Sequence, residues 1–268
     1  MRELGWVEGQ NVEFEPRCSD DANQLPLLAA DLVRQRVDLL FTTGTGAARA
    51  AKQATTGIPI VFLVGGDPVK RDIVDSMSRP GANLTGFALG LYDEKQLQVL
   101  RAALPGISRV AYAVLEGVDP WNWVNPDVAR TLGVQIQHIT VQDLDDFAAF
   151  FTAAKQAGAE AALIPDVPRL TPRLKSIGMA ASLSRLPAIG FRREFAESGG
   201  LLSYSPKLSE GYTRMAIQID KILRGAKPAE LPVEQPTRFE LVINLKEAKA
   251  LGLSIPRLVR LSADELIQ

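Results

Sequence analysis

The sequence predicts an α/β protein made of two doubly wound units in tandem, each with a parallel sheet covered by helices. Continuous apolar runs such as Ile58–Val64 are typical of strands that are buried on both faces. Segments with apolar residues at helical spacing follow these runs, which is the order of β-α-β units. The alternation breaks at a turn-rich stretch, RPGANLT at Arg79–Thr85, and then restarts.

The first unit is expected to alternate strands and helices from its start. We expect strands at Val12–Phe14, Val37–Phe41 and Ile58–Val64, and helices over Gln24–Arg36 and Ala47–Thr55. The Gln24–Arg36 segment is predicted to be a helix because its apolar residues recur on one face. Asp67 and Pro68 suit the N-cap and the first position of a further helix.

The second unit repeats the pattern, and the last quarter of the chain departs from it. Asp143 is a plausible N-cap for a helix that Gly158 ends, with Phe147 and Phe151 on its apolar face. The other expected helices are Tyr92–Leu104, about Pro172–Ser184, Tyr212–Leu223 and Leu245–Leu251, and the expected strands are Arg109–Leu115, Val134–Thr140, Ala161–Pro165, Pro187–Phe191 and Phe239–Asn244. A proline-punctuated stretch in this last quarter is typical of a chain that crosses between two lobes more than once, and such lobes enclose a cleft.

Composition favours a small-molecule partner. The 268 residues are 46% apolar and 23% charged, with a net charge of -1, so no strong field attracts nucleic acid. Cys18 and His138 are the only residues of their types, which argues against Cys/His zinc sites, disulfides and Cys-His dyads. His138 is expected on the solvent side of its strand. We therefore predict no catalytic residue, no metal and no cofactor.

No run reaches the roughly 18 apolar residues of a membrane span, and the first residues do not form a signal peptide.

Two Gly-rich strand ends in the first unit are the leading candidate site. Thr43, Gly44, Thr45 and Gly46 follow one strand, but they lack the Lys-Ser pair of a Walker loop and the third glycine of a dinucleotide loop. A helix N-terminus after such a loop favours a carboxylate, although a plain βα turn explains the glycines equally well. The next strand ends in Gly66 and Asp67, so the two loops are expected to adjoin, with helix capping the likelier role of the Asp67 side chain.

Acidic residues follow two strands of the second unit. Glu116 and Asp119 come after one strand and Asp166 after another, without a local partner that would make an acid/base pair. Asp166 is a candidate for pairing with a ligand amine, and a turn-forming role has similar weight. Trp121 and Trp123 could stack on a ligand or pack over the lobe.

Several stretches resemble the substrate-binding proteins of ABC transporters, some of which bind tryptophan or related aromatic amino acids. They include GWVEGQNVEFEPR, AKQATTGIPIVFLVGGDPV, RPGANLTG, GGLLSYSP and, most specifically, ILRGAKPAELPVEQPTRFELVINLKEAKALGLSIP. The resemblance implies a type I periplasmic-binding-protein-like fold, in which two Rossmann-like lobes are joined by three crossings and close on a ligand by hinge motion. The implied lobes are residues 1–87 plus 206–232 and residues 88–205 plus 233–268.

The resemblance also implies the site and the partners. The first-lobe wall would be the Thr43–Gly46 loop with Gly66 and Asp67, and the second-lobe wall would be Glu116, Asp166, Phe191 and Arg192, with Tyr204 at a crossing. The ligand would be an amino acid or aromatic acid, with its carboxylate at the Thr45/Gly46 helix N-terminus and its amine near Asp166. ABC permease subunits would be the protein partners, nucleic acid would not be one, and the location would be the periplasm or a lipoprotein anchor.

The chain departs from the family pattern in two places. It begins at what resembles the last turn of the first helix, RELG, so a central first strand of the first lobe is expected to be missing. The connection DPWNWVNPDVARTLGV is short and interrupted by Pro120 and Pro126, which should shorten its helix. Two other classes share this architecture: a cytosolic α/β enzyme and the effector-binding domain of a transcriptional regulator. The absence of a catalytic cluster argues against the first, and the lack of a basic helix-turn-helix argues against the second.

Overall fold

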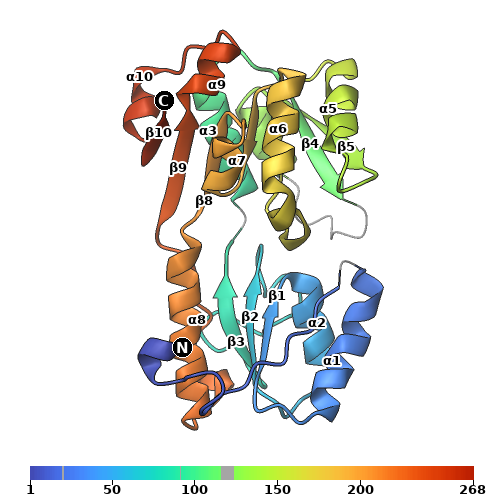
Figure 1. Ribbon diagram of the computed structural model, residues 1–268, viewed down its shortest axis with the longest axis vertical. Helices are drawn as coiled ribbons and strands as arrows, with labels where there is room; N and C mark the ends of the chain where they lie inside the picture. The colour runs from blue at the N-terminus through green and yellow to red at the C-terminus, as the bar shows by residue number, and fades with distance from the viewer. Residues whose placement is uncertain (20, 91, 116–123) are drawn as a thin grey trace. The chain divides into compact units, whose positions relative to one another are not determined.

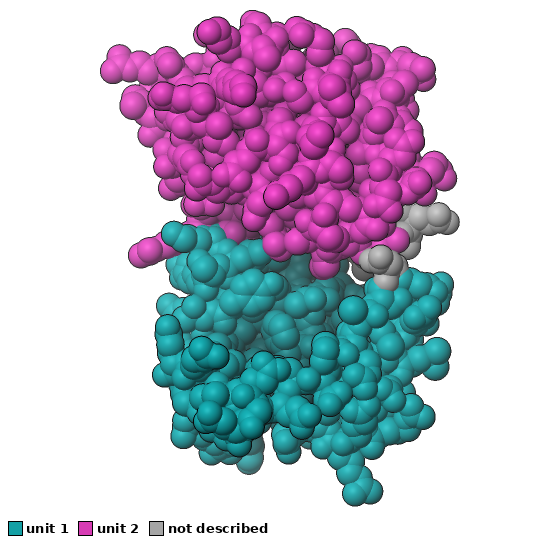
Figure 2. Space-filling view, in the orientation of Figure 1, with its two compact units in different colours: residues 1–90, 207–237 teal, residues 91–206, 238–268 magenta. Residues whose placement is uncertain are grey.

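A computed structural model describes residues 1–19, 21–90, 92–115 and 124–268. The chain forms two compact units, shown in different colours in Figure 2. Unit 1 comprises residues 1–90 and 207–237, and unit 2 comprises residues 91–206 and 238–268. The chain therefore passes from one unit to the other at three places along the sequence, which is the connectivity expected of the periplasmic-binding-protein-like fold.

Unit 1 has a parallel sheet with the strand order β1-β2-β3 (Figure 1). Its strands are β1 Leu40–Thr43, β2 Ile60–Val64 and β3 Leu84–Ala88; its α-helices are α1 Leu25–Arg34, α2 Thr45–Ala54 and α8 Leu208–Leu223; and its 3₁₀ turns are η1 Arg2–Leu4, η2 Ala22–Gln24 and η5 Pro228–Glu230. Every residue of β2 and β3 is buried, because helices cover both faces of the sheet.

The two faces of this sheet pack on different helices. Ile60, Phe62 and Val64 alternate along β2 and pack with alanines of α2 on one face. Val61 and Leu63 point the opposite way and pack with Met215 and Ile222 of α8. In Figure 1, α1 and α2 accordingly lie on the side of the sheet away from α8. A fully apolar strand between two helical layers is what the run Ile58–Val64 predicted.

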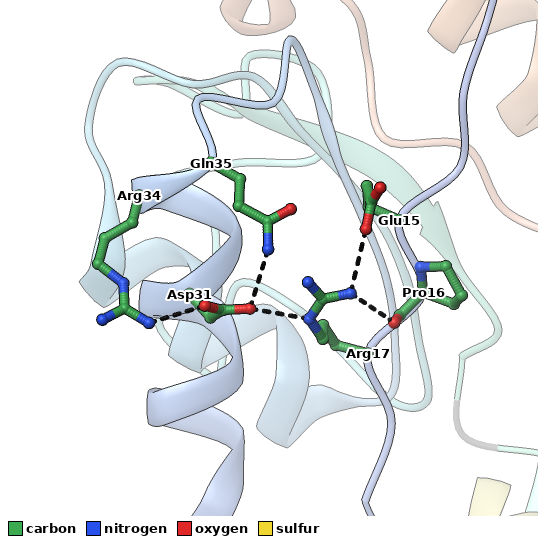
Figure 3. Close-up of polar contacts among 6 residues, drawn as sticks. All are labelled: Glu15, Pro16, Arg17, Asp31, Arg34 and Gln35. Atoms are coloured by element: carbon green, nitrogen blue, oxygen red, sulfur yellow. Dashed lines mark hydrogen bonds and ion pairs between the residues drawn. The ribbon is translucent and has the colours of Figure 1, made fainter.

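The N-terminal segment of unit 1 is held by side chains instead of by strand pairing. Arg17 Nε donates to Asp31 Oδ2 of α1 at 2.8 Å, and Arg34 Nη2 donates to the other oxygen of Asp31 at 2.7 Å (Figure 3). The predicted strand Val12–Phe14 is wrong, since only Val12 makes an isolated bridge, with Glu8. Pro16, which lacks a backbone N–H, follows closely and cannot extend a ladder.

Unit 2 has a seven-stranded sheet in the order β10-β9-β8-β7-β6-β4-β5, parallel except between β8 and β9. Its strands are β4 Arg109–Leu115, β5 Gln135–Val141, β6 Ala161–Leu163, β7 Ala188–Gly190, β8 Leu202–Pro206, β9 Phe239–Asn244 and β10 Glu265–Ile267. Its helices are α3 Asp93–Ala103, α4 Pro126–Thr131, α5 Phe147–Gln156, η4 Pro168–Arg173, α6 Leu174–Ser184, α7 Arg193–Glu197, α9 Leu245–Ala250 and α10 Arg257–Leu261.

Two apolar cores lie on the two faces of this larger sheet. One joins alternate residues of β4 to the aromatic face of α5 and to α6, with Phe147 and Phe151 buried as the pattern predicted. The other joins the remaining β4 residues to α3 and α9. His138 is exposed on β5, as expected, and its ring meets Tyr112 edge-on.

Several local predictions were wrong, each for a local reason. The segment after Asp67 forms a series of turns, because Asp72 takes a left-handed backbone conformation that interrupts any helix. The N-cap of α5 is Asp146, which accepts from the Ala149 N–H; Asp143 accepts from Asp145 in a preceding turn. The turn-rich stretch Arg79–Thr85 runs directly into β3, a strand that the sequence pattern did not reveal because it contains Gly86.

Candidate functional site

The end of β1 presents backbone groups at the start of α2. Gly44 takes φ 91° and ψ 149°, a conformation that suits glycine, and its N–H donates to Leu63 O of β2 at 2.8 Å. Because α2 begins at Thr45, the predicted loop is shorter than expected, and Thr45 and Gly46 lie in the first turn. Glycine at the N-cap supplies no side-chain acceptor to that turn. These N–H groups can therefore bind an anion.

The end of β2 adjoins this turn through a buried arginine. Arg71 is 5% exposed, and its Nη1 donates to Thr45 Oγ1 at 2.9 Å. The guanidinium lies directly against Gly66, where an added Cβ would fall 2.8 Å from Nη2. Asp67 accepts from the Val69 N–H at 2.9 Å and so stabilises the turn that carries Arg71. Arg71 thus joins the two loops that sequence reasoning singled out.

In unit 2, the carboxyl ends of β6 and β7 bring polar side chains together. Asp166 follows β6 and accepts a hydrogen bond from the hydroxyl of Tyr92, which immediately precedes α3. Tyr92 is buried, at 6% exposure, whereas Asp166 keeps some exposed surface. The buried hydroxyl therefore holds one oxygen of a largely buried carboxylate.

Burial is the main cause of the pKa shifts of Tyr92 and Asp166. It raises the pKa of Asp166, and the Tyr92 hydrogen bond and the nearby Arg192 charge partly oppose that rise. Burial and the negative charge of Asp166 hold the pKa of Tyr92 well above its ordinary value. Tyr92 consequently stays neutral and acts as the hydrogen-bond donor.

Arg192 occupies a strained position beside this pair. It follows β7 with φ 59° and ψ 150°, a region that L residues rarely adopt. Its backbone N–H donates to Ser205 Oγ at 3.2 Å, and its guanidinium lies 5.9 Å from the Phe191 ring centroid. The Nε atom is buried and has no hydrogen-bond partner among the described residues. Backbone strain at a strand end often marks a ligand contact.

Aromatic rings border the same edge of the sheet. Tyr204 on β8 and Phe239 on β9 are diagonal neighbours in the antiparallel ladder, with ring centroids 5.4 Å apart and planes 8° from parallel. Phe239 also meets Tyr92 edge-on at 6.3 Å. Tyr204 and Phe239 are only partly buried, so they offer an apolar surface beside the charged groups.

The sequence of residues 1–267 matches the family described as ABC transporter substrate binding protein. The chain belongs to this family. Its two α/β units, with sheets that are parallel except for the β8–β9 pair, are those of the periplasmic-binding-protein-like fold, which confirms both the fold class and the family resemblance.

Known relatives of this substrate-binding protein share low identity over nearly its whole length. A tyrosine-binding protein from Clostridioides difficile (strain R20291) is 23% identical over 286 residues, covering 99% of this chain and 76% of its own. A conserved domain protein from Vibrio cholerae has a TM-score of 0.88 at 24% identity, covering 99% of this chain and 90% of its own. An ABC domain from Streptococcus pneumoniae in complex with L-Trp has a TM-score of 0.83 at 23% identity, covering 99% and 92%.

The structure of this substrate-binding protein groups most of the predicted site residues within each unit. Thr43–Gly46 adjoin Gly66 and Asp67 in unit 1, and Asp166, Arg192 and Tyr204 lie at one edge of the sheet in unit 2. The Phe191 ring has no exposed surface, so it supports Arg192 from the core and offers no ligand contact in this structure. Glu116, Trp121 and Trp123 lie outside the described residues.

Sequence reasoning missed three residues of these clusters. Arg71 stands in the charged run VKRD, which has the composition of a solvated surface. Tyr92 appears only as the start of a helix, and Phe239 only as the start of a strand. Their roles depend on contacts with residues far away in the sequence, so local spacing carries no signal for them.

Neither a membrane span nor a metal cluster is found in the described part of the chain. No helix there combines the length and hydropathy needed to cross a bilayer. No group of three or more His, Cys, Asp or Glu side chains there is arranged to hold a metal ion.

Proposed function

We propose that this substrate-binding protein captures a small amino-acid-like or aromatic carboxylate ligand in a cleft between its two units. The observation that carries the proposal is the cluster of Asp166, Arg192 and partly exposed aromatic rings at one edge of the unit 2 sheet. In open α/β sheets, ligands bind at the carboxyl ends of strands. Asp166 follows β6 and Arg192 follows β7, while Tyr204 lies on β8 and Phe239 pairs with Pro206 at the end of β8.

Each unit contributes a different type of contact to the proposed site. Unit 1 supplies the first-turn N–H groups of α2, near Thr45, which suit a carboxylate. Unit 2 supplies the acidic oxygen atoms of Asp166 and the Tyr204–Phe239 ring pair, which suit an ammonium and an apolar side chain. The tyrosine-binding and L-Trp-bound relatives support a ligand of this class.

The protein would then present its loaded form to the membrane subunits of an ABC importer. Membership of a family of transporter substrate-binding proteins supports this role, and it implies action outside the cytoplasmic membrane, in the periplasm or on a lipid anchor. Such two-unit binding proteins enclose a solute when their two units close around it by hinge motion.

Thermal-shift screening tests this proposal directly. The purified chain is heated with aromatic amino acids, branched amino acids, benzoate and hydroxybenzoates, with glucose as an unlike control. A ligand that binds only the folded state raises the melting temperature, by an amount equivalent to about 2.7 kcal/mol at a concentration a hundred times its Kd. A set of curves in which no amino acid or aromatic acid raises the melting temperature contradicts the proposal.

A further inference from the structure

The carboxyl ends of β6 and β7 hold two opposite charges that lie near each other without pairing. Among the described residues, Asp166 accepts one hydrogen bond, from Tyr92. The Arg192 guanidinium makes no hydrogen bond and no ion pair with any described residue, and its buried Nε has no partner. Asp166 and Arg192 follow neighbouring parallel strands, in which Leu163 pairs with Ile189, and the Arg192 charge lowers the pKa of Asp166.

Such an arrangement is unfavourable in a binding protein that has no ligand. Half-buried charges lose solvation, and an ion pair between them would recover part of that loss. Here the carboxylate keeps unused acceptor positions, and the guanidinium keeps its donors. A molecule that carries a cation and an anion on adjacent carbon atoms can satisfy both groups at once, through charge-assisted hydrogen bonds.

Tyr92 gives the carboxylate a fixed orientation. Its hydroxyl donates from the buried side, and its ring is packed edge-on against Phe239. The Asp166 side chain is therefore anchored at one oxygen and has capacity left for a second donor. The strained backbone of Arg192 holds its side chain beside this group in spite of the conformational cost.

We propose that unit 2 recognises both charges of a free α-amino acid by itself, with the ammonium on Asp166 and the carboxylate on Arg192. Tyr92 acts as the positioning residue for Asp166. This inference rests on the proposed function, and it narrows the ligand class from amino acids or aromatic acids to zwitterionic amino acids. It also adds Arg192 as a carboxylate contact besides the start of α2.

Isothermal titration calorimetry with three matched ligands tests the inference. L-Phenylalanine carries both charges, 3-phenylpropionate lacks the ammonium, and 2-phenylethylamine lacks the carboxylate, while all three keep the same ring. We expect L-phenylalanine to bind at least about tenfold more tightly than either analogue, because each missing partner leaves a half-buried charge unsatisfied.

Single substitutions then separate the two charges. Asp166→Asn should weaken L-phenylalanine and 2-phenylethylamine by about tenfold or more and leave 3-phenylpropionate unchanged or tighter. Arg192→Gln should weaken L-phenylalanine and 3-phenylpropionate and spare 2-phenylethylamine. Matched controls are the exposed Arg193→Gln, next to Arg192, and Asp127→Asn on α4, both of which should leave all three affinities unchanged.

Tyr92→Phe provides a readout that a purely structural role would not change. The groups that act on the Tyr92–Asp166 pair are Arg192, from the turn after β7, and Asp93, from α3. Ionised Asp166 binds the ammonium, so affinity for L-phenylalanine falls as the pH drops through the pKa of Asp166. Because the Tyr92 hydrogen bond lowers that pKa, its removal should shift this acid limb to higher pH.

The possible results separate failure of the inference from failure of the proposed function. Equal affinity for L-phenylalanine and 3-phenylpropionate, or an unchanged ligand preference in both Asp166→Asn and Arg192→Gln, overturns the inference and leaves a solute-binding protein. An acid limb that stays in place in Tyr92→Phe removes Tyr92 from the assignment. If no amino acid or aromatic acid binds the unmodified chain in titration or in the thermal screen, the proposed function itself fails.

Discussion

Gly44 in unit 1 and Arg192 in unit 2 occupy the same structural position with different residues. Each follows a parallel strand and is the N-cap of the next helix, with ψ 149° at Gly44 and ψ 150° at Arg192. Both have positive φ, 91° and 59° respectively. Glycine takes this backbone conformation without steric strain, whereas for arginine the strain costs roughly 1–3 kcal/mol.

The difference fits the ligand contacts that we propose for each unit. Unit 1 keeps the unstrained residue and offers backbone N–H groups, so its side chains can be small. Unit 2 keeps a strained arginine next to Asp166 and Tyr92, so side chains supply the specific interactions of the proposed site there. Natural proteins commonly retain such strain where function requires the side chain. Substitutions at these strand ends test the contrast.

The largest expected effect on stability is at Gly66, which lies against Arg71 in unit 1. Gly66→Ala adds a Cβ to a residue at φ 73° and places it 2.8 Å from the Arg71 guanidinium. Displacement of Arg71 would also break its hydrogen bond to Thr45. We expect a loss of about 3 kcal/mol of unfolding free energy, measured by urea denaturation.

Gly65→Ala is the matched control for this substitution. No heavy atom lies within 4 Å of a Cβ built at Gly65, and its φ is outside the left-handed region. Stability should therefore stay within about 0.5 kcal/mol of the unmodified protein. If the two variants have equal stability, the contact between Gly66 and Arg71 does not define this wall.

The second effect compares alanine with glycine at the two equivalent positions. Gly44→Ala should destabilise unit 1, and Arg192→Ala should be less stable than Arg192→Gly, each by roughly 1–3 kcal/mol, because alanine keeps the strain that glycine relieves. Both alanine variants lack a functional side chain, so the comparison isolates the backbone. Thermal unfolding followed by calorimetry measures both differences.

Gly57→Ala serves as the reference for this pair, because its added Cβ meets nothing within 4 Å and its φ is outside the left-handed region. A glycine preference at 44 without one at 192 would show that the two turns are not equivalent. The contrast drawn between the units would then rest on the side chains alone.

The contrast also shows which features local sequence patterns can reveal. The strands Arg109–Leu115 and Phe239–Asn244 were predicted with their observed bounds, because apolar β-branched runs bounded by polar turns are local signals. The strand Leu84–Ala88 was missed, because Gly86 and the preceding turn residues interrupt its apolar pattern. This segment is a strand because it is buried beside β2 and against α8, and the local sequence does not show those contacts.

The candidate site also contains residues with a local sequence signal and residues that only tertiary contacts reveal. Asp166 was predicted because it stands directly after a strand, where ligands bind in α/β folds, and Arg192 because the family resemblance implied it. Tyr92 lies 74 residues from Asp166 and Arg71 lies 26 residues from Thr45, so no local spacing links the members of these pairs. Residues at strand ends could be inferred from the sequence. The side chains that position them, Tyr92 and Arg71, could be identified only from the tertiary structure.

The smallest expected effect compares two carboxylates whose pKa values shift in opposite directions. Asp31 in unit 1 is bonded to Arg17 and Arg34, which lower its pKa below the ordinary 3.8, whereas burial raises the pKa of Asp166 in unit 2. Asp31 therefore stabilises the fold above pH 3.8, and this contribution disappears as the pH falls through the folded-state pKa. The ionisation of Asp166 has the opposite effect, so stability is lost as the pH rises through its raised pKa.

Melting temperatures of Asp31→Asn and Asp166→Asn between pH 3 and pH 7 measure this opposition. Asp31→Asn should lower stability at neutral pH and converge with the unmodified protein in acid. Asp166→Asn should raise stability at neutral pH relative to acid, because the amide keeps an acceptor for Tyr92 without a half-buried charge. Asp127→Asn, at an exposed pair, should follow the unmodified curve. If Asp166→Asn lowered stability at neutral pH, Asp166 would be a structural group of unit 2, and the proposed division between a backbone wall and a side-chain wall would lose its main support.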